Sequence, residues 1–461
     1  MRLNSTGKST ARDMTQGPIL QQLVYFALPL MLGNVFQMLY NTVDSVIVGN
    51  FVSKQALAAI GSTTVIVNML VFFFNGFSIG AAVLISRYFG ARNMRKLHDA
   101  IETTMAATFV LSLLFSLLGV ALVKPMLQIM RTPEDVMADA ALYLRIYFGG
   151  ISGLLIYNMG SGILRAVGDS TRPLYFLILT SILNILLDLF FVIVLKAGIA
   201  GAAIATILSQ FLSAALILML LTRAKDVYRM SWRELHIDRV ILGKIFAVGM
   251  PAAIQSVITA FSNIFVQGYI NVFGSDVMAG WSSYNKLDQF IMLPMQSMAM
   301  AATTFVSQNI GAGNERRSDR GTVTALEMSC GVTGAIALAL FLFAPAAVRL
   351  FSPDAAVIRY GVMFLRTNVF FLLFNCINHV LAGALRGRGD SRGPMVIMLS
   401  TFVALRQCYL YWVTHYVANT PQLVGFGYPV GWMACCAVEL SYYYFKHRRR
   451  VRAEALSDPE S

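Results

Sequence analysis

Two carboxylates lie inside apolar stretches of the sequence, where a charge is unfavourable. Asp44 follows 25 uncharged residues that run from Ile19 to Val43, and Asp188 lies in the otherwise uncharged stretch 174–195. A carboxylate at the centre of a bilayer costs about 2.5–3.5 kcal/mol on the insertion scale, so such residues are rare without a use. Each acid alone could hydrogen-bond a kinked helix, but together they indicate a site that binds a proton or a cation.

Two neutral polar residues are placed to join these acids. Asn184 precedes Asp188 on the same face of a helix, because residues four apart are neighbours there. Asp188 is about 14 residues into its span, or roughly 21 Å deep, and Thr206 lies at a similar depth on the returning span. We therefore expect Asp44, Asn184, Asp188 and Thr206 to converge. Two close carboxylates favour binding a proton, and oxygen ligands also suit a hard cation such as Na⁺.

The composition sets the solvent in which these groups must lie. The chain has 461 residues, of which 57% are hydrophobic and 13% are charged, and its mean hydropathy is +0.65. Soluble domains carry roughly 25% charged residues, so the composition excludes a cytosolic enzyme, a disordered chain and a nucleic-acid binder. The net charge of +13 is typical of cytoplasmic loops in a membrane protein.

The apolar residues are gathered in stretches long enough to cross a bilayer, which takes about 20 residues. The predicted spans are 20–49, 56–85, 101–123, 137–163, 174–195, 199–222, 242–273, 277–308, 322–348, 357–384, 395–416 and 424–445. This number is even, so both termini lie on one side. Basic residues concentrate at 87–96, 223–244 and 446–452, which makes both termini of this multi-pass cell-membrane protein cytoplasmic.

The second half of the sequence repeats the first. Pro29 recurs as Pro251, and three motifs recur 221 residues later. They pair Gly90–Asn93 with Gly311–Asn314, Tyr143–Arg145 with Phe364–Arg366, and Leu164–Pro173 with Leu385–Pro394. Because six spans per half is an even number, the halves share one orientation, related by a pseudo-two-fold axis along the membrane normal.

These observations predict an all-α polytopic membrane protein with twelve transmembrane helices in two six-helix bundles. Its predicted parts are a cytoplasmic N-terminal tail at 1–18, a first six-helix bundle at 19–222, a cytoplasmic linker at 223–241, a second six-helix bundle at 242–445 and a basic cytoplasmic tail at 446–461.

The second half does not repeat the acids. The counterpart of Asp188 is Tyr409, and Asp44 corresponds to Phe265 or Val266. We therefore expect ion coupling in the first bundle only.

Two further ionisable residues fall inside spans of the second half. Arg406 is either a structural cation bonded to carbonyls or a charge that shapes a cleft. His379 is either a packed group or a proton relay.

With these residues in place, the sequence resembles the multidrug and toxic compound extrusion (MATE) family of cation-coupled efflux transporters over nearly its whole length. The resembling residues are Pro29, Val43-Asp44-Ser45 with Gly49, Ala56-Leu57-Ala58-Ala59, Leu164-Arg165 with Gly168-Asp169, Asn184 with Asp188, and Gly201-Ala202-Ala203 through Thr206. The resemblance implies a V-shaped, two-lobed carrier that extrudes organic compounds in exchange for H⁺ or Na⁺.

The branch resembled is that of the DNA-damage-inducible prokaryotic transporters, in which acids of the first lobe carry the ion. That resemblance assigns cation coupling, by H⁺ or by Na⁺, to Asp44, Asn184, Asp188 and Thr206, and a helix bend to Pro29. Another branch uses a glutamate in span 7 and an aspartate in span 10, where this chain has Gln255 and Asn375.

A substrate cleft would be lined by polar and flexible side chains of the central spans. Methionine suits a pocket that accepts many shapes, although packing and helix–helix hydrogen bonds are alternatives. The candidates are Gln37, Tyr40, Asn41, Gln255, Gln289, Met292 and Met295.

The sequence thus predicts a cation-coupled antiporter that exports small amphipathic, often cationic organic compounds by rocker-switch alternating access. It is not an enzyme, it has no cofactor besides the coupling ion, and no Walker motif indicates ATP hydrolysis. Its partners are small organic substrates and membrane lipids, with no nucleic acid, and it acts as a monomer. A lipid-linked precursor flippase of the same superfamily is the main alternative, and an ion channel is a more distant one.

Overall fold

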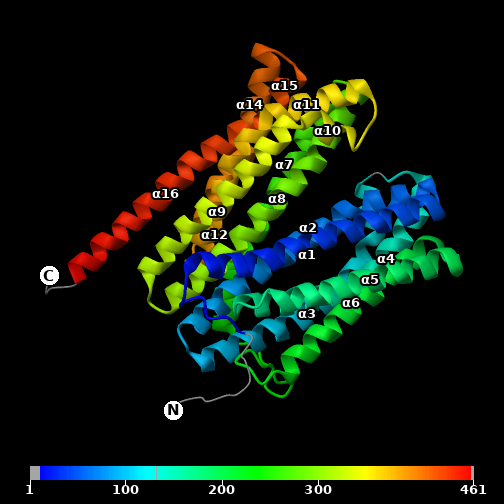
Figure 1. Cartoon of the computed structure of the whole chain (residues 1–461). Coiled ribbons are helices and arrows are strands. Elements are labelled where there is room, and N and C mark those ends of the chain that lie inside the picture. The colour runs from blue at the N-terminus through cyan, green and yellow to red at the C-terminus, as the bar shows by residue number, and fades with distance from the viewer. Residues whose placement is uncertain (1–10, 131, 458–461) are drawn as a thin grey trace. The chain divides into compact units, whose positions relative to one another are not determined.

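The computed structural model describes residues 11–130 and 132–457, which divide into two compact units. Every element of the described residues is a helix, and twelve helical stretches are long and apolar enough to cross a membrane (Figure 1). The prediction of an all-α protein with twelve membrane spans is therefore confirmed.

The first unit consists mainly of the six spans of the first half. They are α1 (Ile19–Phe51), α2 (Lys54–Gly90), α3 (Met94–Ile129), α4 (Glu134–Ala166), α5 (Thr171–Asp188) continued by the π-helix η1 (Leu189–Val194), and α6 (Gly198–Arg223). Helix α4 lies at the centre, packed against α2, α3 and α6, while α5 packs on α6. The site residues predicted on α5 and α6 are thus on adjacent helices.

The second unit holds the spans of the second half. They are α7 (Arg239–Asn271), α8 (Ser275–Gly311), α9 (Glu315–Leu342), α10 (Ala344–Arg349) with α11 (Ala355–Asn368), η2 (Val369–Phe371) and α12 (Leu372–Gly387), then α13 (Arg392–Met398), η3 (Leu399–Leu405), α14 (Arg406–Trp412) and η4 (Val413–Val417), and finally α15 (Pro421–Gly425) with α16 (Gly427–Ser457). Helix α12 packs against α9 and α16, around a core that contains Trp281, Tyr284 and Phe364.

The boundary between the units passes through two helices rather than through the linker. It divides α1 between Ala27 and Leu28, and α7 between Met250 and Pro251. Both helices continue through a proline near this boundary, Pro29 in α1 and Pro251 in α7. Proline removes one hydrogen bond of the helix, so the repeat places a weak point at the same place in each half. The bend at Pro29 remains a prediction.

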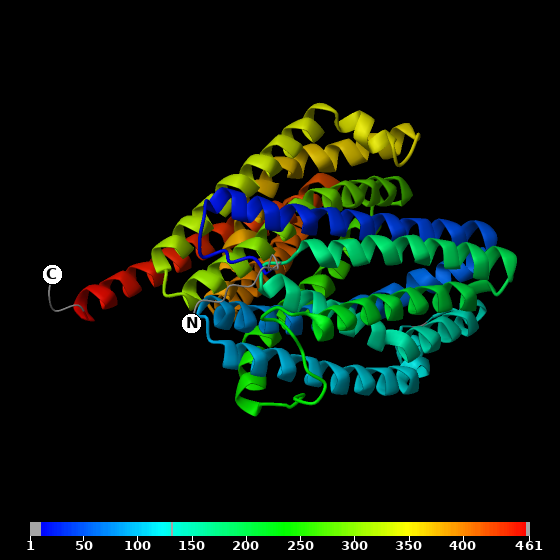
Figure 2. The ribbon, with the colours of Figure 1, turned by 60° about the horizontal axis from the view of Figure 1, so that its bottom comes forward.

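The predicted linker is packed against the first unit. Tyr228 and Met230 are each 1% exposed and belong to a hydrophobic cluster with residues of α2, α3 and α4. The backbone N–H of Asp238 donates to Thr103 Oγ1 at 3.1 Å, and Trp232 stacks on Phe109. Figure 2 shows the segment in green as it loops back past α3.

The repeated Gly-Asp-Ser motif starts the fifth span of each half. Gly168 and Gly389 have φ values of +86° and +87°, a left-handed conformation that glycine adopts without strain. Asp169 Oδ1 then accepts hydrogen bonds from two backbone N–H groups at the start of α5, and Asp390 Oδ1 accepts one from Gly393 N–H in α13. A side-chain oxygen here satisfies donors that have no partner within the helix.

Both fifth spans contain π-helical segments, which the sequence did not predict. In the first unit the π-helix η1 begins directly after Asp188. In the second unit η3 ends directly before Arg406, and η4 follows α14. Single π-turns are often found at functional sites because they displace a side chain from its regular helical position.

Two predicted segments extend beyond the described residues. Residues 1–10 of the predicted N-terminal tail and residues 458–461 of the predicted basic tail lie outside the described part of the chain, as do the side chains after Lys446.

Candidate functional site

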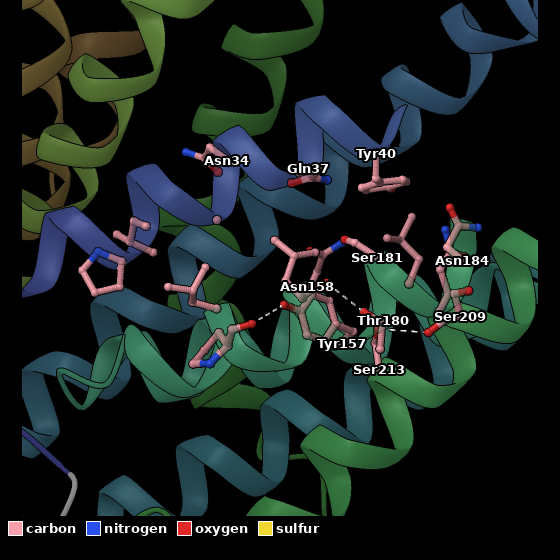
Figure 3. Close-up of a pocket in the computed structure, with 18 of the residues that line it drawn as sticks. Asn34, Gln37, Tyr40, Tyr157, Asn158, Thr180, Ser181, Asn184, Ser209 and Ser213 are labelled. Carbon is pink, nitrogen blue, oxygen red and sulfur yellow. Dashed lines mark hydrogen bonds between the residues drawn. The ribbon is translucent and has the colours of Figure 1, made fainter. Parts of the chain in front are cut away.

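A cavity of about 110 Å³ lies inside the first unit, between α1, α4, α5 and α6 (Figure 3). Most of the residues that line it are polar. Its walls are formed by Pro29, Leu30, Gly33, Asn34, Gln37 and Tyr40 of α1, Leu154, Tyr157, Asn158 and Arg165 of α4, Ser170, Pro173, Leu174, Leu177, Thr180, Ser181 and Asn184 at and along α5, and Thr206, Ser209, Gln210 and Ser213 of α6. This volume holds a few water molecules or one small ion with its waters.

The hydroxyl groups around the cavity present mainly acceptor oxygens. Thr180 donates to the carbonyl of Phe176 at 2.9 Å, and Ser209 donates to that of Ala205 at 2.9 Å. Ser213 donates in turn to the carbonyl of Ser209 at 3.0 Å. Because the hydroxyl protons are used within the helices, the lone pairs remain available, and these walls suit a cation or a water that donates.

The two predicted acids face each other. Asp44 of α1 and Asp188, the last residue of α5, lie within electrostatic range of one another. Asp188 is 0% exposed, and neither of its oxygens nor Asp44 Oδ1 has a hydrogen-bond partner among the described residues. Buried carboxylates without partners are unfavourable as charges. The pair therefore needs either a proton or a bound cation.

The two neutral residues of the predicted set lie on the cavity wall. Asn184 is 2% exposed, and neither its amide nitrogen nor its oxygen has a partner among the described residues. The hydroxyl of Thr206 donates to Ala202 O at 3.0 Å, which leaves its oxygen as an acceptor. Asp44 and Asp188 are not among the residues that line this cavity, so the expected convergence of all four residues stays a prediction. Each of the four carries an oxygen of the kind that a hard cation prefers.

Two tyrosines lie near the acid pair, and a third stacks on one of them. Tyr40 lines the cavity, and both Tyr40 and Tyr143 of α4 lie within electrostatic range of the two acids. Tyr143 stacks on Tyr147 with ring centroids 6.1 Å apart. Aromatic walls of this kind exclude bulk water while keeping a polar group close to the carboxyls.

Arg165 places a positive charge in the cavity wall. It comes from α4 at the end where Ser170 and Pro173 also line the cavity, whereas Asn184 and Thr206 lie farther along their helices. The described residues form no ion pair with it. The cavity therefore has a fixed cation in one wall, and Tyr40 in another wall lies within electrostatic range of the acid pair.

The other predicted residues are found in different surroundings. Gln37 and Tyr40 line the cavity, but Asn41 does not, and Gln289 is exposed. Gln255 is buried and accepts a hydrogen bond from Arg386 at 3.0 Å.

The two methionines predicted for the cleft also differ from each other. Met292 Sδ accepts a hydrogen bond from Asn375 at 3.3 Å. Met295 is 0% exposed in the core of the second unit.

The two basic residues predicted inside spans of the second unit differ in what the structure shows of them. Arg406 is buried, and its Nη2 donates to Ser262 Oγ and Asn263 Oδ1, each at 2.8 Å. Its guanidinium lies over the ring of Tyr428 at 4.6 Å. These contacts favour the interpretation of Arg406 as a structural cation, although it is bonded to side-chain oxygens and not to backbone carbonyls. His379 lies within electrostatic range of Arg386.

Several lining residues were not predicted, among them Asn158, Arg165 and Gln210. Each is a polar residue within an apolar span, which is the signal that could have found them. Their helix faces become known only when α4 and α6 are packed.

The second unit contains a buried acid that the sequence analysis did not single out. Glu439 of α16 is 0% exposed. It lies on a different span from the positions compared with Asp44 and Asp188, so the repeat did not reveal it.

Comparison with known proteins identifies the repeat and the fold. The family model described as MatE matches residues 29–190 and again 251–412, stretches that begin at Pro29 and Pro251. The chain is 31% identical to the probable multidrug resistance protein YpnP of Bacillus subtilis, over 95% of this chain and 97% of that protein. It is 25% identical to the probable multidrug resistance protein YoeA of the same organism, over 92% and 93% of the two chains.

The solved structures agree in fold. A crystal structure of MATE in the bent conformation superimposes with a TM-score of 0.91 at 23% identity, covering 98% of this chain and 100% of that one. The two-lobed fold with twelve helices is therefore confirmed, and the roles of the predicted site residues stay predictions.

Proposed function

The chain belongs to the multidrug and toxic compound extrusion (MATE) family of transporters, and from this premise we propose that it exports small amphipathic organic compounds in exchange for a coupling ion. As a member of this family it is a multi-pass membrane transporter and not an enzyme. We propose the cell membrane as its location and cytoplasmic positions for both termini, because the basic residues concentrate in the segments on that side.

The observation that supports this function most directly is the isolated acid pair. Asp44 and Asp188 lie within electrostatic range of each other, and three of their four oxygens have no hydrogen-bond partner among the described residues. A buried, unneutralised pair of carboxylates is strongly unfavourable. The pair must therefore bind a positive charge, which can be a proton or Na⁺.

In the proposed cycle, an ion from outside binds at Asp44 and Asp188 when substrate has left. The change of charge alters the contacts of α1, which carries Asp44 and also Pro29, where one helical hydrogen bond is missing. Alternating access then exposes the site to the cytoplasm, the ion is released, and the next substrate binds. The downhill movement of the ion supplies the work for export.

The pair also explains why substrate and ion would compete. A cationic compound that reaches Gln37 or Tyr40 on the cavity wall approaches the acids, and its charge satisfies them in place of the ion. This argument favours cationic substrates.

Dye efflux from proteoliposomes tests the proposal. Wild type, D44N and D188N are reconstituted, and export is followed under an imposed pH gradient and, separately, an imposed Na⁺ gradient. The proposal expects one of these gradients to drive export in wild type and neither to do so in the variants. Undiminished gradient-driven export by both variants would refute it, and ion conductance without saturable exchange would favour a channel.

A further inference from the structure

The second unit contains a buried acid that the proposed coupling site does not use. Glu439 is in α16, within the span Pro421–Lys446, and its side chain is 0% exposed. Its Oε1 has no hydrogen-bond partner among the described residues, and its Oε2 accepts only from the thiol of Cys435 at 3.8 Å. A thiol is a weak donor, so this environment does little to stabilise a negative charge.

A guanidinium lies near this acid without being paired to it. Arg386 of α12 is within electrostatic range of Glu439, but none of the ion pairs between described residues joins them. Arg386 Nη2 instead donates to Gln255 Oε1 of α7 at 3.0 Å, and its buried Nε has no partner among the described residues. Each of the two opposite charges therefore has an unsatisfied atom that the other could satisfy.

The groups that surround Glu439 limit what it can bind. Besides Arg386 of α12, the titratable side chains within electrostatic range are the thiols of Cys435 and Cys436 on α16 itself. From η3, Thr401 contacts Cys435 through a side-chain hydrogen bond. A sodium ion requires several oxygen ligands, and a neighbouring guanidinium repels it. A proton needs only one carboxylate oxygen.

The repeat indicates that the acid is an addition to the second unit. Arg386 belongs to the repeated Leu-Arg motif and corresponds to Arg165 of α4, whereas the counterpart of Glu439 is Leu218. Arg165 lies within electrostatic range of Tyr157. The two units therefore share a buried arginine, but only the second has a carboxylate facing it.

We propose that Glu439 is a second proton-binding site of this protein, and that its charge decides which helix holds Arg386. With a proton on Glu439, the neutral carboxyl is compatible with its apolar surroundings, and Arg386 stays on Gln255 of α7 as observed. When the proton leaves to water, the buried carboxylate requires a partner, and Arg386 turns from α7 to α16.

The movement of Arg386 from Gln255 to Glu439 takes place close to the proline of α7. Gln255 follows Pro251 by one helical turn, and Pro251 is where the boundary of the compact units crosses α7. Loss of the Arg386 bond removes a tie between α7 and α12 next to this point. The site is independent of the proposed role of Asp44 and Asp188, and it can be tested without transport.

Infrared difference spectroscopy of the full-length protein in lipid tests the proposal, because a protonated carboxyl has a C=O band that a carboxylate lacks. A pH change should reveal a component that is lost in E439Q and kept in D44N/D188N. It should also be kept in E327Q, which removes an exposed glutamate of α9. The proposal would be overturned if every component seen in the wild type persisted unchanged in folded E439Q, or if no component appeared over the range in which the protein stays folded.

Two further measurements test the assignment of the proton to a glutamate and the role of Arg386 separately. The first uses the wild type and therefore remains informative if E439Q misfolds. Selective ¹³C labelling of glutamate carboxyls in the wild type must shift this component, and a shift restricted to labelled aspartate would contradict the assignment. In R386Q the pH at which the component titrates must change, because the charge facing Glu439 is gone. An unchanged titration in folded R386Q would refute the role given to Arg386.

Discussion

Replacement of Asp188 by asparagine should abolish ion-driven accumulation of substrate, and the structure gives the size of the loss. Asp44 and Asp188 lie within electrostatic range of each other. Two unit negative charges about 4 Å apart repel by about 4 kcal/mol at an effective dielectric constant of 20, which disfavours the doubly ionised pair by a factor of roughly a thousand. The pair therefore exchanges one proton per cycle rather than two.

One proton moving through one pH unit supplies about 1.4 kcal/mol, which is a tenfold concentration ratio. Wild-type proteoliposomes with a gradient of one pH unit and a clamped membrane potential should therefore concentrate a monovalent dye such as ethidium about tenfold. In D188N the amide donates to the Asp44 carboxylate at every pH, so no proton is exchanged and the ratio falls to about one. A tenfold gradient of Na⁺ at equal pH gives the same arithmetic if Na⁺ is the coupling ion.

The matched control is D135N, which removes an exposed acid from the first turn of α4. It should keep the wild-type ratio. A D188N ratio equal to that of wild type would refute the assignment of the site. A wild-type ratio of about a hundred would contradict the exchange of a single proton.

Three predictions concern parts of the molecule outside the site. A Cβ at Gly80 would lie 2.2 Å from a backbone oxygen of α7, so G80A should destabilise the protein by about 1–3 kcal/mol in thermal unfolding, while G61A, which meets nothing within 4 Å, should not. Burial raises the pKa of Asp390, but hydrogen bonds from Lys446 and neighbouring groups outweigh it and hold that pKa below its ordinary value. The ionised Asp390 carboxylate thus stabilises the fold at neutral pH, and this stabilisation is lost in strong acid. D390N should lower the free energy of unfolding by about 1 kcal/mol at neutral pH only. An equal loss at all pH values would contradict this. A hydrogen bond to the backbone carbonyl of Glu234, aided by the carboxylate of Glu102 on α3, raises the pKa of His236. The stabilising charge is therefore lost as the pH rises, and hydrogen exchange of the linker should become faster between about pH 6 and about pH 8, beyond the intrinsic pH effect. H236Q should remove this additional increase.

The acid pair could be predicted from the sequence because its signal is chemical and local. A carboxylate within a long uncharged stretch is unfavourable in a membrane, whatever the packing of the helices, so the residue types around Asp44 and Asp188 suffice to single them out. The repeat is evident for a similar reason, since the Gly-Asp-Ser motif keeps the same turn in both halves, with Gly168 and Gly389 in the left-handed region.

The cavity could not be predicted from the sequence to the same degree. Serine, threonine and asparagine are common in membrane helices, where they often bond to their own backbone, as Ser209 does. Whether such a residue lines a cavity depends on the rotation of its helix, which packing decides. For this reason the predicted cleft residues include both true lining residues and a core residue. Gln37 and Tyr40 line the cavity, whereas Met295 lies in the core of the second unit.

Glu439 was missed for a physical reason as well. It lies in the last span, a short distance before Lys446, where an acid in the sequence is equally compatible with the membrane surface. Its complete burial follows from the packing of α16 against α12. The π-helical segments are similarly a result of packing, because no residue in 189–194 breaks a regular helix.

The exchange of substrate for an ion at Asp44 and Asp188 can be measured most directly as proton release on substrate binding. Purified protein in weakly buffered detergent solution is mixed with a cationic substrate, and the pH change is recorded with an indicator dye. If the proton is the coupling ion, wild type should release about one proton per molecule bound and D44N/D188N none; if Na⁺ is, the same experiment with ²²Na⁺ should show its displacement. Substrate binding by wild type that displaces neither ion, or an equal displacement from the double variant, would contradict the account.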